Sequence, residues 1–197
     1  MAIARSLTTR VIHLLLLSAV LCQLATSQFM EKPYPGETAS PTFSLHEYAG
    51  LGSLAIVGAF WLWAVIRHGE TRLGRLIPWL SASARKAVFV DAAAQLRRLA
   101  RLQPPSDKDG ALASAVHGLG LLAVTAMAVS GTLYYFGPHA VFGRQALALH
   151  KVFANVIWAY LLAHAGLALL HHVLGSDILS RMFWTGRRWP RAVRSGR

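Results

Sequence analysis

The chain has 197 residues, of which 54% are hydrophobic and only 14% are charged, and its mean hydropathy is positive at +0.42. This composition is typical of a small membrane protein with several spans and argues against an ordinary soluble domain. The net charge of +12 would suit nucleic-acid binding, but the basic residues are confined to particular connections and to the tail. We therefore expect no nucleic-acid partner.

Four stretches are long and apolar enough to cross a bilayer core about 30 Å thick. They predict an all-α membrane protein, a four-transmembrane-helix up-down bundle. Charge within them is sparse, because Glu47 and Lys151 lie only at their outer ends. We treat residues 1–197 as a single membrane domain with helices at about 11–30, 45–66, 112–136 and 146–173.

The first stretch, 11–30, also resembles a signal peptide, because arginines precede it and residues 24–27 offer a cleavage region. Its apolar run is longer than the roughly 7–15 residues usual in such signals. It also contains His13, for which a signal sequence has no use. We therefore expect the first helix to be retained.

The basic residues predict the orientation of the chain. The N-terminus, the connection 67–111 and the tail after the fourth span are rich in arginine and lysine, whereas the other two connections are not. The positive-inside rule then predicts a multi-pass protein of the bacterial inner membrane with both termini in the cytoplasm. Basic segments next to the membrane attract anionic headgroups, so membrane lipid is an expected partner.

The cytoplasmic connection 67–111 contains a helix-like segment at 83–102, which begins after Pro78 and ends before Pro104. Its apolar positions alternate with arginines, a pattern typical of an amphipathic helix lying on the bilayer surface. A solvated, charged linker fits these residues equally well.

The histidines are the most informative feature of the spans. His150 and His164 lie in the fourth span about 21 Å apart along the helix and within about 40° of one face. Ionisable residues are costly inside a membrane and usually mark a function. His46 begins the second span at the depth of His150, and His13 lies in the first span near the depth of His164.

Two imidazoles at each of two depths predict two stacked haems, each iron held by two axial histidines. His117, near the inner end of the third span, is an alternative inner ligand to His13, since depth does not separate them. For any one of these histidines alone, an interhelical hydrogen bond is an equally good explanation. Cys22 is the only cysteine and no C-x-x-C-H motif is present, so any haem is non-covalent haem b. The remaining histidines are expected at the membrane interfaces: His68, His139, His171 and His172.

The fourth span resembles the last helix of the bacterial cytochrome b561 family. The resemblance is carried by His150, Lys151, His164, His171 and His172 in a fixed spacing, followed by Asp177, Leu179, Arg181 and Met182. Arg10 with His13, Leu45 with His46 and Gly50, and His117 with Gly131 resemble the first three helices of that family. The resemblance covers all four helices but not residues 68–110.

The resemblance implies a membrane cytochrome with two b haems that carries electrons and exchanges them with quinone. Family members often have tryptophan after the first histidine, where this chain has Leu14, and this difference keeps His117 as an alternative inner ligand. The iron ligands implied by the resemblance are His46 and His150 for the outer haem, and His13 and His164 for the inner haem.

Three basic residues are candidate partners for haem propionates. At the outer haem the candidates are Lys151 and, as the weaker one, Arg144; at the inner haem the candidate is Arg10. For each of the three, a role as an anchor at the membrane interface is the simpler explanation. Two other functions fit the sequence. The wider superfamily includes haem b membrane-anchor subunits of hydrogenases and other dehydrogenases, which would use the basic connection to dock a redox partner protein. A haem-free membrane adaptor or metal carrier is the other. No hydrolytic or phosphate-binding motif is present, and the sequence leaves open whether the chain is a quinone-linked oxidoreductase or a subunit of one.

Overall fold

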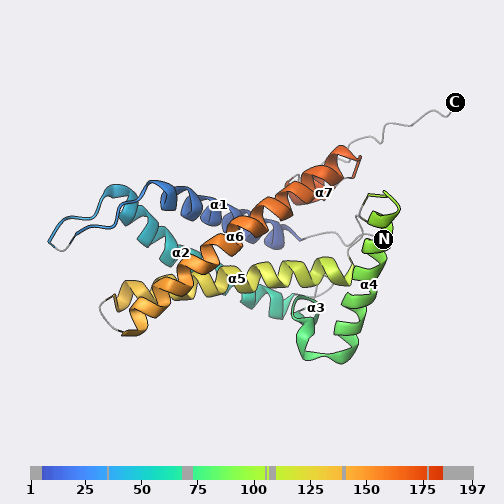
Figure 1. Ribbon diagram of the computed structural model, residues 1–197, viewed down its shortest axis with the longest axis horizontal. Coiled ribbons are helices and arrows are strands. Elements are labelled where there is room, and N and C mark those ends of the chain that lie inside the picture. The colour runs from blue at the N-terminus through green and yellow to red at the C-terminus, as the bar shows by residue number, and fades with distance from the viewer. Residues whose placement is uncertain are drawn as a thin grey trace.

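The computed structural model describes residues 6–34, 36–67, 73–104, 106, 110–138, 141–176 and 178–183, and within them all regular structure is helical. Four helices are long and apolar enough to cross a membrane, which confirms the predicted fold class. In Figure 1 they run back and forth along the long axis of the molecule. These helices are α1 (Leu7–Phe29), α2 (Pro41–Ile66), α5 (Ala111–Phe136) and α6 (Val141–Val173).

Local sequence explains where the spanning helices begin. The Ser40 hydroxyl accepts a hydrogen bond from the Phe43 amide at the start of α2, and Pro41 occupies the first helical position. Helix α6 begins at Val141, five residues before the predicted start at 146. Arg144 lowers the local hydropathy without preventing a helix, so a prediction from apolar length misses this first turn.

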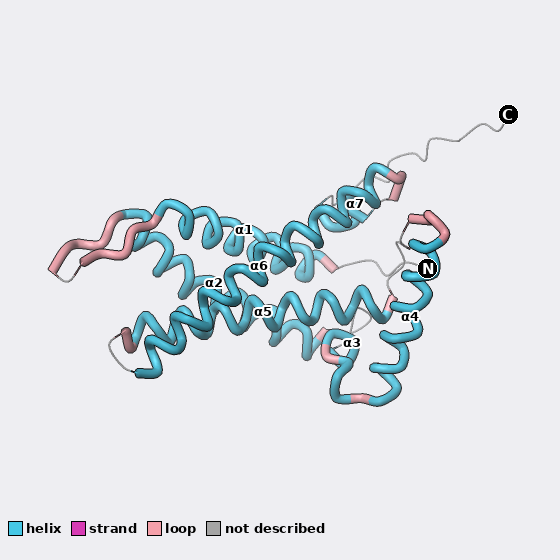
Figure 2. The backbone as a smooth tube through the Cα atoms, viewed as in Figure 1, coloured by secondary structure: helices cyan, strands magenta, loops and turns pink. Residues whose placement is uncertain are grey.

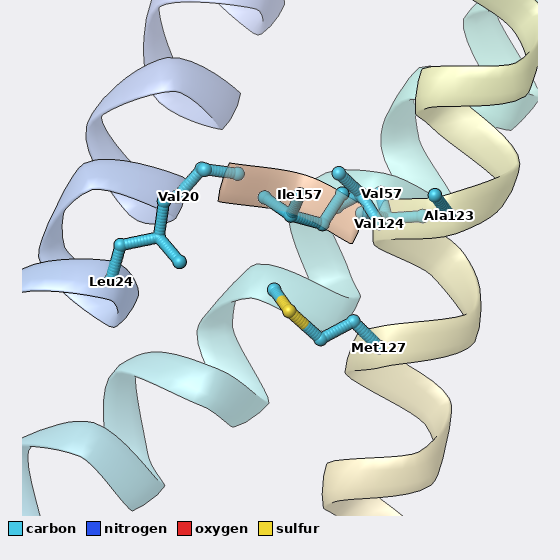
Figure 3. Packing of buried hydrophobic residues seen from close by; sticks show 7 residues of the cluster. All are labelled: Val20, Leu24, Val57, Ala123, Val124, Met127 and Ile157. Atoms are coloured by element: carbon cyan, nitrogen blue, oxygen red, sulfur yellow. The ribbon is translucent and has the colours of Figure 1, made fainter. Parts of the chain in front are cut away.

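The spanning helices pack in pairs, α1 along α2 and α5 along α6, and α2 joins the pairs by packing against α5. Side chains from all four helices meet in one apolar cluster in the middle of the bundle (Figure 3). Ile157 of α6 is only 1% exposed and lies seven residues from both His150 and His164, about 10 Å along the helix from each. The cluster contains Val20, Leu24, Val57, Ala123, Val124, Met127 and Ile157.

Two tryptophans tie α2 to its neighbours through hydrogen bonds. The Trp61 indole N–H donates to the Thr125 hydroxyl on α5 at 3.0 Å, and the Trp63 indole donates to the Thr9 hydroxyl on α1 at 2.8 Å. Between membrane helices there is little hydrophobic driving force, so interhelical bonds of this kind help to fix which faces meet.

Shorter helices follow α2 and cover the end of the bundle at which α5 begins. They are α3 (Leu73–Leu76), the 3₁₀ turn η1 (Pro78–Leu80) and α4 (Ala82–Ala100). Helix α4 runs crosswise to the spanning helices (Figures 1 and 2). The Leu112 amide donates to the Asp91 carboxylate at 2.9 Å, so Asp91 caps the first turn of α5. A short helix α7 (Ile178–Phe183) follows α6.

The side of α4 opposite Asp91 is exposed. Phe89 and Leu96 are 69% and 66% exposed there, and at 100° per residue both lie on the far side of the helix from Asp91. Since Asp91 meets the first turn of α5, this apolar side faces away from α5. Basic side chains flank it on both edges: Arg85, Lys86 and Arg97.

Candidate functional site

The structure brings His46 of α2 and His150 of α6 together, in agreement with the prediction that both lie at the same depth. Their ring centres are 6.2 Å apart and the ring planes are nearly perpendicular, at 89°. Both rings are half-buried and line a cavity of about 280 Å³ to which all four spanning helices contribute. Other residues that line this cavity include Gln23, Glu47, Gly50, Gly131 and Lys151.

A backbone hydrogen bond fixes the tautomer of His150. Its Nδ1 atom lies 2.8 Å from the carbonyl oxygen of Met127 on α5. A carbonyl only accepts hydrogen bonds, so Nδ1 carries a hydrogen, and in the neutral ring Nε2 then keeps its lone pair. Gly131 gives the ring its space, because a β-carbon there would lie 2.9 Å from Cε1 of His150.

The tautomer of His46 follows from a hydroxyl on α1. Its Nδ1 atom lies 2.9 Å from the Thr26 hydroxyl oxygen. The Thr26 hydroxyl directs its one hydrogen to the backbone carbonyls of Cys22 and Gln23, at 2.8 and 3.1 Å. The hydroxyl oxygen is therefore the acceptor for Nδ1–H of His46, and Nε2 of this ring also keeps its lone pair.

The two rings have the form and spacing of a pair of metal ligands. A neutral imidazole that donates through one nitrogen to an acceptor and presents the other is the usual metal-binding form. A metal bound at about 2 Å by two opposed imidazole nitrogens holds the ring centres about 6 Å apart. The separation of 6.2 Å between the ring centres matches that spacing, so the distance between His46 and His150 suits two axial ligands of one haem iron.

The half of α6 nearer its C-terminus has a different arrangement. His164 contacts His117 of α5, with ring centres 5.2 Å apart at 80°, and stacks on Tyr160 at 5.4 Å and 8°. Gly120 of α5 gives Tyr160 its space, because a β-carbon there would overlap the phenol ring. His13 is half-buried on α1. The structure thus brings His117 to His164, while the pairing of His13 with His164 stays a prediction.

Of the other residues that the sequence singled out, Lys151 lines the cavity at His46 and His150, and Arg144 is exposed near the start of α6. Arg10 lies one turn before His13 on α1. At the end of α6, His171 is buried and His172 is exposed, whereas His68, His139 and Asp177 lie outside the described residues.

Sequence reasoning missed the hydrogen-bond partners of His46 and His150. Met127 acts through its backbone carbonyl, which any residue would supply, so no side-chain pattern could have identified it. Thr26 had a usable signal, because it and Gln23 are polar residues three positions apart on one face of an otherwise apolar helix. Tyr160 had a similar sequence signal, because it lies four positions before His164 on the same face of α6.

A four-helix membrane bundle that brings two imidazoles from different helices together in one cavity fits a class, that of membrane-embedded haem proteins. The sequence model of prokaryotic cytochrome b561 matches residues 4–185, and the chain belongs to this family. The protein is therefore a multi-pass membrane b-type cytochrome that binds haem b and acts in electron transfer. Comparison with curated proteins and with solved structures gives no match.

Proposed function

We propose that the protein is a dihaem cytochrome that carries electrons across the bacterial inner membrane and exchanges them with the quinone pool. The observation that supports this most is the pair His46–His150, in which both Nδ1 atoms have acceptors and both Nε2 lone pairs remain for a metal. The haems, when bound, supply one-electron chemistry at the iron.

In this proposal the chain's own residues hold and separate the two groups. His46 and His150 hold the outer haem, and His13 and His164 hold the inner one, as the family resemblance implies. The apolar cluster around Ile157 lies between the two depths and excludes water from the interval. Quinone exchange rests on the family resemblance alone.

The basic residues support the proposed orientation. Helix α4 and the last turn of α6 lie toward the same end of the bundle (Figure 1). Arginines and lysines are concentrated in the connection that contains α4 and in the tail after α6. The positive-inside rule then favours an inner-membrane protein with both termini in the cytoplasm.

A reduced-minus-oxidised visible spectrum of the purified protein, with haem counted per chain, tests the proposal. We expect a b-type spectrum and two haems per chain. A single haem would show that one of the two histidine pairs is structural. A folded preparation that takes up no haem on reconstitution would contradict the cytochrome function and favour a haem-free adaptor or metal carrier.

One observation favours a second candidate, a haem-bearing anchor subunit for a soluble enzyme. The exposed side of α4 combines Phe89 and Leu96 with a border of cations, and it faces away from α5. An apolar patch rimmed by one sign of charge suits a protein partner with an acidic, apolar surface.

If that candidate is right, a soluble subunit co-purifies with the tagged protein in a fixed ratio. Joint replacement of Arg85, Lys86 and Arg97 by alanine is then expected to release it without changing the haem count. Arg75→Ala, which removes an exposed cation of the same connection from outside α4, is the control. A subunit that stays bound to the triple variant would show that α4 is not its docking surface.

A further inference from the structure

Two polar side chains on α1 are buried against α2. Gln23 and Thr26 are 6% and 8% exposed, in a helix whose other buried residues include Val20 and Leu24. A polar group inside a membrane protein is costly unless it has a hydrogen-bond partner. Both residues find theirs at His46 of α2, so α1 supports that histidine twice.

The two contacts act on different parts of His46. The Gln23 amide N–H donates to the His46 backbone carbonyl at 2.9 Å and fixes the main chain. The Thr26 hydroxyl lies 2.9 Å from Nδ1 and fixes the ring. Because the hydroxyl hydrogen is already given to α1 carbonyls, the oxygen is polarised into a better acceptor.

The hydrogen-bond acceptors of His46 and His150 differ in whether a substitution can remove them. His150 donates to a main-chain carbonyl, which no substitution removes. His46 donates to a side-chain hydroxyl, which a single substitution removes. Without that hydroxyl, Nδ1–H has no acceptor in this orientation, and the hydrogen is free to move to Nε2, where it would block a metal bond.

We propose that Thr26 is a positioning residue for the outer haem: its hydroxyl holds His46 in the Nδ1–H tautomer and strengthens Nε2 as an iron ligand. This inference rests on the proposed role of His46 as an axial ligand. An acceptor on the far nitrogen makes the imidazole a stronger donor to the metal, which stabilises the oxidised iron and lowers its midpoint potential.

The test compares Thr26→Val, which keeps the shape and loses the hydroxyl, with Thr26→Ser, which keeps the hydroxyl. We expect Thr26→Val to weaken outer-haem affinity about 10- to 100-fold and to raise the midpoint potential of that haem. Thr26→Ser should restore both values. Redox titration of the full-length holoprotein and haem titration of the stripped protein provide the two readouts.

Thr125→Val is the matched control. Thr125 also donates to the carbonyl four residues earlier, at 2.7 Å, and accepts one side-chain N–H, from Trp61. It lies on α5 and serves no histidine in those bonds, so its loss should leave the outer potential unchanged. An unchanged inner haem in every variant reports that the bundle has folded.

Three outcomes would overturn the proposal. Thr26→Val could match the unsubstituted protein in both readouts, or Thr26→Ser could fail to restore them, or Thr125→Val could shift the outer potential equally. The variant His46→Ala tests the ligand assignment on which the proposal rests. If His46→Ala retains both haems, the proposed ligand set is wrong. If His46→Ala loses one haem but Thr26→Val changes neither haem affinity nor midpoint potential, only the role of Thr26 is refuted.

Discussion

Replacing His150 by alanine is expected to lower the haem content from two to one per chain. His150 is the α6 member of the proposed ligand pair, and its Nδ1 atom is already bonded to the Met127 carbonyl, so alanine leaves the outer iron with His46 alone. The ring lines a cavity and lies outside the apolar cluster, so the bundle should still assemble. Haem extraction with protein quantification measures the count, and the visible spectrum identifies the haem that remains.

The control for this variant is His172→Ala, which removes an exposed imidazole from the end of the same helix. It should retain both haems. If the His150 variant also retains two haems, with unchanged midpoint potentials, then His150 serves only as an interhelical hydrogen-bond donor to α5.

The second large effect concerns the inner haem, for which His13→Ala and His117→Ala are expected to differ. We expect the His13 variant to lose one haem and the His117 variant to keep two. The ring centres of His117 and His164 are 5.2 Å apart, closer than the roughly 6 Å that a metal between two imidazoles requires. The ring of His117 therefore contacts that of His164 directly instead of facing it across a metal.

The same haem counts decide this question, together with His164→Ala, which should lose the inner haem in either case. The reverse result, with haem lost from the His117 variant and kept in the His13 variant, would make His117 the ligand. In that case α5 and α6 would have to separate slightly when haem binds.

The sequence predicted the fold well because a helix that crosses a membrane needs about 20 consecutive apolar residues, which are easy to identify. The four spans were each identified from that length, and the depths of His46 and His150 predicted that they would lie together. Depth says nothing about rotation around a helix axis, however. This is why the sequence could not distinguish His13 from His117 as the neighbour of His164.

Two other features lay beyond the sequence for physical reasons. The tautomer of His150 depends on a main-chain carbonyl, which has no sequence signature. The direction of the exposed side of α4 depends on Asp91, whose role as the cap of α5 joins residues 21 positions apart. Amphipathic spacing predicted a helix at 83–102, and α4 occupies Ala82–Ala100, but that spacing does not say which side meets the bundle.

The apolar layer around Ile157 has an electrical consequence. If electrons pass between the depths of His150 and His164, they move about 21 Å through a hydrocarbon core about 30 Å thick. Each electron would then cross roughly 70% of the membrane voltage, equivalent to about 1.6 kcal/mol for every 100 mV. The transfer would be electrogenic, and its direction and extent would respond to the state of charge of the membrane as well as to the chemistry at either face.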